Sequence, residues 1–151
     1  MPSLEEMRAM TWMAIAGGAN GIIGYSYFDL KKFKGAEADL SDTEKQALFL
    51  KRWETLKQVA SDIAPWIPVM LSVEQPLAIE PDTAHAPEVA FRLYAKDGVT
   101  YLLLVNTTLE PQTAVFRLPP GTQSQDAQIP VSDNVLSVPL QGLQNLWVPL
   151  R

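Results

Sequence analysis

The chain has 151 residues, enough for one ordinary domain or two small units, and its 47% apolar and 19% charged residues are typical of a folded globular protein. The net charge of −5 argues against a broad nucleic-acid surface, which needs clustered Lys and Arg. The absence of cysteine excludes disulfides and thiolate chemistry. The single histidine, His85, lies near Glu80 and Asp82 in a Pro-containing loop, so we expect a surface position and no metal site or cofactor.

The N-terminal residues predict a helix that begins after Ser3. Ser3 and Glu6 have the spacing of a capping box, in which each side chain binds a backbone N–H at the helix start. Apolar residues then recur at helical spacing, and the pair Gly17 and Gly18 ends the helix. The segment lacks the basic start and apolar run of a signal peptide, so no targeting segment is predicted.

Residues 21–28 predict a strand. Their sequence, GIIGYSYF, is apolar on both faces and rich in β-branched and aromatic residues, which is typical of a parallel strand buried on both sides. The apolar stretch over residues 10–25 is interrupted by glycines and is shorter than the ~20 residues of a membrane span. No membrane-spanning segment is therefore predicted.

A polar loop over residues 31–39 leads to a second, longer helix. Ser41 and Glu44 form another capping box, and Pro65 marks the end of the helix. A stripe of apolar residues on one side predicts the buried face: Phe49, Trp53, Leu56, Ala60 and Ile63. We expect residues 66–71 to form a short packed connector, and Trp12, Trp53 and Trp66 to lie in the core.

The character of the sequence changes near residue 72. Nine of the 12 prolines follow it, which favours turns and edge strands over helices. Short alternating runs predict a small antiparallel β-sandwich with a hairpin turn at residues 96–98. The predicted strands are residues 89–95, 99–105, 113–118, 127–131, 135–140 and 146–150.

Residues 6–27 (EMRAMTWMAIAGGANGIIGYSY) resemble the end of the catalytic barrel in glycoside hydrolases of the large (β/α)8 clan. In those enzymes a helix carrying Arg and Trp or Tyr leads through a small-residue turn into the eighth strand. Residues 63–72 resemble the exit from the eighth helix, and residues 99–106 are similar to the central strand of the sandwich that often follows. The resemblance implies an α+β fold, with helix 7, strand 8 and helix 8 of a barrel in residues 1–72 and an antiparallel β-sandwich in residues 73–151.

The resemblance also implies a function. The chain would be the C-terminal part of a glycosidase, completing and bracing the catalytic barrel without activity of its own. In this clan the two catalytic carboxylates follow the fourth strand and lie at the seventh strand, and both positions would precede Met1. No catalytic residue is therefore expected in this chain. Two other hypotheses stay open: a stand-alone carbohydrate-binding or accessory sandwich, which would show a planar row of aromatic residues, and a purely structural interaction module.

Four residues are candidates for substrate binding. Tyr27, Phe28 and Asp29 lie at the predicted C-terminal end of the barrel strand, where barrel active sites form. An aromatic ring there would stack on a sugar and a carboxylate would bind its hydroxyls, whereas the structural alternative is packing under the helices and the start of a loop. Trp147, in the last predicted strand, could stack on carbohydrate or fill the gap between the sandwich and the helices.

The partners expected from this interpretation are carbohydrate, through the parent enzyme, and further copies of the chain. A strand over residues 22–28 would have two bare edges and two apolar faces in the isolated chain, and exposed strand edges recruit other strands. The isolated chain is therefore expected to form homo-oligomers. Neither nucleic acid nor a membrane is expected as a partner.

Overall fold

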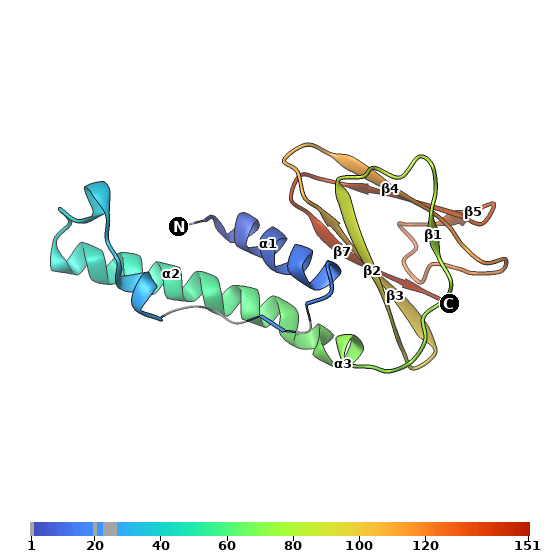
Figure 1. Ribbon diagram of the computed structural model, residues 1–151, viewed down its shortest axis with the longest axis horizontal. Coiled ribbons are helices and arrows are strands. Elements are labelled where there is room, and N and C mark those ends of the chain that lie inside the picture. Colours follow the sequence, from blue (N-terminus) through green and yellow to red (C-terminus); the bar gives the residue numbers. More distant parts are fainter. Residues whose placement is uncertain (1, 20, 23–26) are drawn as a thin grey trace.

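The computed structural model describes residues 2–19, 21–22 and 27–151. Within them the helices come first and the strands follow (Figure 1). The helical elements are α1 (Leu4–Ala16), η1 (Tyr27–Lys31), η2 (Gly35–Glu37), α2 (Asp42–Ile63), η3 (Ala64–Trp66) and α3 (Ile67–Met70), where η marks a 3-10 helix. The strands are β1 (Glu80–Pro81), β2 (Val89–Lys96), β3 (Val99–Asn106), β4 (Gln112–Arg117), β5 (Val131–Ser132), β6 (Val135–Leu140) and β7 (Asn145–Leu150).

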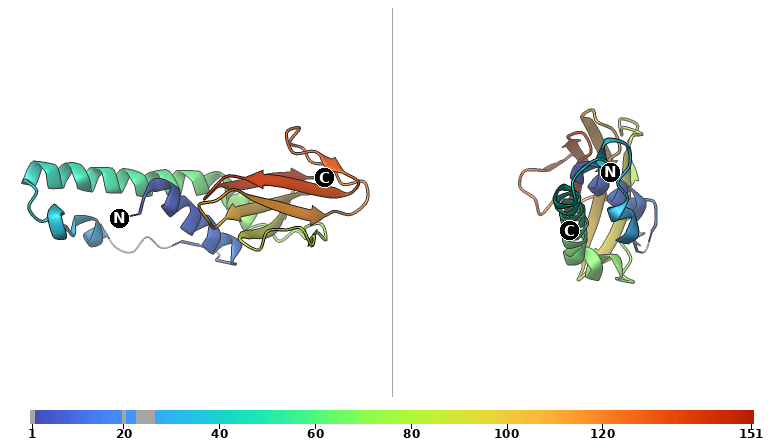
Figure 2. Two further views of the ribbon diagram at one scale, coloured as in Figure 1. Left: turned by 90° about the horizontal axis from the view of Figure 1, so that it is seen from above. Right: turned by 90° about the vertical axis from the view of Figure 1, so that its left-hand side faces the viewer.

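Both long helices begin where the capping boxes predict. At α1 the Ser3 backbone N–H donates to a Glu6 carboxylate oxygen at 2.6 Å, and the Glu6 N–H donates to Ser3 Oγ at 3.2 Å. The same reciprocal pair starts α2. Arg8 on α1 donates from Nε to the Asp62 carboxylate on α2 at 2.6 Å, which ties the two helices together. Figure 2 shows α2 extending far beyond the sheets.

The strands form two antiparallel sheets in the described part of the chain, with orders β1-β4-β6-β5 and β2-β3-β7. Their inner faces share an apolar core, so the predicted antiparallel sandwich is seen. Asp97 and Gly98 take positive φ in the predicted hairpin turn between β2 and β3. The alternating side chains of Leu102 and Leu104 on β3 point into this core.

A second core joins the sandwich to the helices. The opposite side chains of β3, Leu103 and Val105, pack with Trp12 and Ile15 of α1 and with Trp147 of β7. Helices α1 and α3 therefore cover the outer face of the β2-β3-β7 sheet (Figure 1). Burial on both faces explains why β3 is apolar at nearly every position.

Three expectations on secondary structure need correction or fall partly outside the described residues. For the predicted strand over 21–28, residues 23–26 lie outside the described part, Gly21 and Ile22 have no regular structure, and Tyr27 begins a 3-10 helix. The predicted strand over 127–131 is wrong, because only Val131 and Ser132 pair as β5. Residues 67–70 of the predicted connector form α3.

The surface position expected for His85 is also wrong. Its half-buried ring lies against Phe116, with centroids 4.8 Å apart, and its Nδ1 accepts from the Val115 N–H at 3.2 Å. The Nε2–H donates to the Val89 carbonyl at 3.1 Å. The imidazole is thus a structural bridge between the two sheets.

Candidate interface on the helical layer

The structure brings Asp29 into a local ion pair. Tyr27, Phe28 and Asp29 are the first three residues of η1, so the last two residues of the strand predicted over 21–28 belong to a 3-10 helix. The Asp29 carboxylate pairs with the Lys32 ammonium one helical turn later. Substrate binding by these three residues stays a prediction.

Trp147 lies between the sandwich and the helices and is only 8% exposed. Its indole stacks on Trp66 with centroids 4.2 Å apart and planes 6° apart, and it meets the edge of Trp12 at 5.7 Å. Tyr94 adds a tilted contact at 5.6 Å and donates its hydroxyl to the Ile15 carbonyl at 3.5 Å. Burial raises the pKa of Tyr94 above its ordinary value. This geometry favours the second expectation for Trp147, in which the ring fills the gap between sandwich and helices.

The buried face of α2 differs from the predicted one. Its buried residues are Phe49, Arg52 and Val59, whereas Trp53, expected in the core, is 41% exposed. Leu50 beside it is 53% exposed, and Ala60 is exposed as well. Of the predicted stripe, Trp53 and Ala60 are therefore exposed, whereas Phe49 is buried and Leu56 and Ile63 are half-buried.

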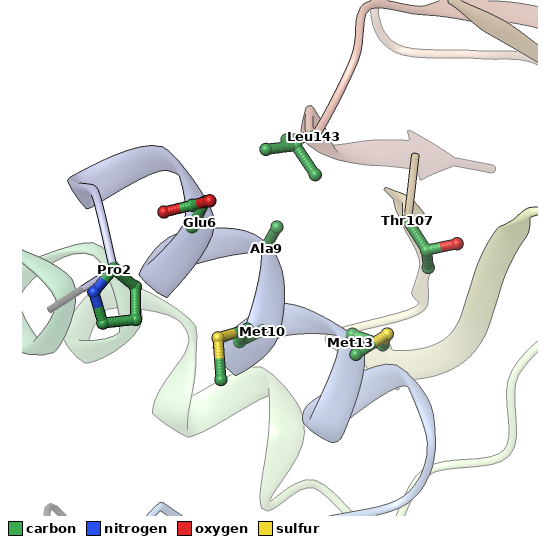
Figure 3. Close-up of a pocket in the computed structure, with 7 residues that line it drawn as sticks. All are labelled: Pro2, Glu6, Ala9, Met10, Met13, Thr107 and Leu143. Carbon is green, nitrogen blue, oxygen red and sulfur yellow. The ribbon is translucent and has the colours of Figure 1, made fainter. Parts of the chain in front are cut away.

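Helix α1 also presents apolar surface. Met10 is 56% and Met13 is 44% exposed. They border an open groove of about 390 Å³ between α1 and two loops of the sandwich, which contribute Thr107 and Leu143 (Figure 3). The other residues that line it are Pro2, Glu6 and Ala9. Large apolar side chains gathered on one exposed surface are the usual mark of a macromolecular interface.

A buried arginine fixes the loop between η1 and α2. Arg52, 7% exposed, donates two hydrogen bonds from Nη2 to the Glu37 carboxylate at 2.8 and 2.7 Å. Its Nη1 donates to the carbonyls of Leu30 and Lys32 at 3.1 and 3.3 Å, and its guanidinium lies over the Phe33 ring at 5.5 Å. The Arg52 hydrogen bonds lower the pKa of Glu37 below its ordinary value of 4.5. Sequence reasoning missed this clamp, because a charged residue on α2 does not signal burial.

The described residues show neither a metal-binding cluster nor a membrane-spanning helix. They contain no cluster of His, Asp and Glu able to hold a metal ion. No described helix combines the length and apolarity needed to cross a bilayer. Neither a protein-family model nor a curated protein matches the chain. The glycosidase interpretation therefore depends on the sequence resemblance and on the geometry of the helical layer.

Proposed function

We propose that this chain is the C-terminal part of a glycoside hydrolase. In this proposal α1, the segment over residues 21–28 and α2 complete a (β/α)8 barrel, and the sandwich braces the barrel. The observation that carries the proposal is the exposed apolar surface of α2, where Leu50 is 53% and Trp53 is 41% exposed. An amphipathic helix normally packs its apolar stripe against a neighbouring element. A preceding barrel body would supply that element.

The buried contact between the helices and the β2-β3-β7 sheet supports the bracing role. Trp12 and Trp66 interlock with Trp147, so the sandwich holds the helices through a buried aromatic cluster. Such a contact fixes the helices relative to the sheets, which is what a brace requires. The alternative, a stand-alone carbohydrate-binding sandwich, gains little support, because Tyr94 and Tyr101 pack into this same cluster instead of forming an open row.

The chemistry expected of this part is support and substrate contact. Hydrolysis of a glycosidic bond needs a pair of carboxylates, about 5–5.5 Å apart when one acts as the nucleophile and farther apart when a water molecule attacks. The resemblance places both in the preceding part of the barrel. Tyr27, Phe28 and Asp29 would contribute sugar contacts at the C-terminal end of the eighth strand.

The first test is to sequence the native DNA upstream of the Met1 codon. The proposal expects an open frame of about 200 or more codons, the length of the missing part of a barrel. The longer protein should then hydrolyse aryl glycosides, whereas the 151-residue chain alone should not. A stop codon directly upstream would refute the proposal.

A second test uses stability and does not depend on finding the substrate. Trp53→Ser should lower the unfolding free energy of the isolated chain less than that of the longer protein, because 41% of the side chain is exposed in the isolated chain. In the longer protein the same change should cost about 3 kcal/mol, since a barrel would bury the ring. Val73→Ser, at a side chain 93% exposed, is the control. Equal costs for Trp53→Ser in both proteins would contradict the proposed covering of α2.

A further inference from the structure

The loop that leads into α2 gathers lysines around one hollow. The volume of the hollow is about 440 Å³. The loop itself runs beside the half of α2 that points away from the sandwich (Figure 1). Every ionisable side chain that lines it is a lysine, in a chain whose net charge is −5. The lining residues are Lys31, Lys32, Phe33, Lys34, Ala38 and Lys45.

Hydrogen bonds from Arg52 of α2 hold the backbone of the loop that carries these lysines. Arg52 binds the carbonyls of Leu30 and Lys32 and grips Glu37, so both ends of the lysine loop are attached to α2. Gly35 supplies the positive φ of 58° that the turn requires. The Ala38 N–H closes that turn on the Gly35 carbonyl at 3.0 Å. The backbone that carries the lysine ammonium groups is therefore fixed before a ligand binds, so less conformational entropy is lost on binding.

The nearby carboxylates leave two of the lysines without a counter-charge. Glu37 is engaged by Arg52, and Asp29 by Lys32. Within the described residues, neither Lys34 nor Lys45 has a carboxylate within salt-bridge distance. The hollow thus carries at least two positive charges that an anionic ligand would neutralise.

We infer that this hollow binds the carboxylate group of an acidic saccharide. The inference rests on the proposed function, because η1 contains Tyr27, Phe28 and Asp29, which that proposal places at the mouth of the barrel. A carboxylate between two ammonium groups accepts charge-assisted hydrogen bonds from both. The sugar ring would then lie on the side of the loop nearest Asp29, whose carboxylate is held by Lys32.

The test is an NMR titration of the ¹⁵N-labelled chain with trigalacturonate, with the neutral trisaccharide cellotriose and inorganic phosphate as comparison ligands. We expect saturable shifts of the Lys34 and Gly35 amides with trigalacturonate alone. The double variant Lys34→Gln/Lys45→Gln should weaken binding about tenfold, the effect of losing about 1.4 kcal/mol of charge-assisted contact. Lys57→Gln, elsewhere on α2, is the matched control and should change affinity less than about twofold.

Each other outcome overturns the inference. Equal shifts with cellotriose would show that charge is not recognised, and equal affinity for phosphate would show a general anion site without a saccharide. Absence of shifts in a chain whose spectrum is that of the folded sandwich would show no site. The two proposals can fail separately. If the longer protein hydrolyses glycosides but does not bind trigalacturonate, only this inference is refuted. If the chain binds trigalacturonate but a stop codon lies directly upstream of the Met1 codon, only the glycosidase assignment is refuted.

Discussion

Replacing Trp147 by alanine should loosen the contact between the sandwich and the helices. The indole is 8% exposed and lies parallel to Trp66 at 4.2 Å, with the edge of Trp12 at 5.7 Å. Deleting a buried Trp side chain costs about 3–5 kcal/mol. The ring contacts with Trp66 and Trp12 are part of that loss and are not added to it.

One feature of the native site reduces the expected loss. Trp147 Nε1 is buried and has no hydrogen-bond partner among the described residues. An unpaired buried N–H already costs about 1–3 kcal/mol in the native protein, and alanine removes that cost. The expected net loss for Trp147→Ala is therefore about 3 kcal/mol. Trp147→Phe keeps an aromatic ring and also removes the unpaired N–H, so its loss should stay below about 1.5 kcal/mol.

Urea unfolding followed by circular dichroism measures both variants. With a slope of about 2 kcal/mol per M, Trp147→Ala should lower the midpoint by about 1.5 M. Val73→Ala, at a residue 93% exposed, should leave it unchanged. A double-mutant cycle with Trp66→Ala should give a coupling of about 1 kcal/mol. The reasoning is refuted if Trp147→Phe costs as much as Trp147→Ala, or if the coupling with Trp66 is absent.

Three further predictions concern the helices. Arg52→Leu should lower the melting temperature at neutral pH and make the melting temperature fall less steeply in acid, as calorimetry from pH 7 to 2 would measure. The reason is that the pKa of Glu37 is lowered from 4.5 in the folded state, so the Glu37–Arg52 pair stabilises the fold fully above pH 4.5 and loses this effect as the pH falls through the lower folded value. Ser41→Ala should destabilise the chain by about 1 kcal/mol in urea unfolding, because it removes the cap of α2. The isolated chain should self-associate with rising concentration, and light scattering should show less association for Met10→Glu/Met13→Glu, because these residues expose apolar surface on α1. A monomer at all concentrations would contradict the expectation.

Elements that local chemistry specifies could be predicted from the sequence. The capping boxes fixed the starts of α1 and α2, and the turn at Asp97 and Gly98 fixed the pairing of β2 with β3. The predicted strand over 127–131 failed for a local reason as well. Asp126 accepts the Gln128 N–H at 2.9 Å and forms a turn that removes these residues from the ladder.

Features set by distant partners could not be predicted. The apolar stripe of α2 indicated Trp53 as core, yet the structure buries Arg52, because the loop over residues 30–37 wraps around its guanidinium. The hollow had a partial signal in the run from Lys31 to Lys34. Only the fold shows that Lys45, a turn into α2, lines the same hollow.

The two faces of the β2-β3-β7 sheet explain why the helices and the sandwich belong to one unit. One face closes the sandwich core, and the other presents Tyr94, Tyr101 and Trp147 to the helices. Without α1 and α3, that second face would expose a contiguous aromatic patch, which soluble monomers rarely do. This face therefore needs α1 and α3 as its cover, which holds the described helices and the sandwich together as one unit.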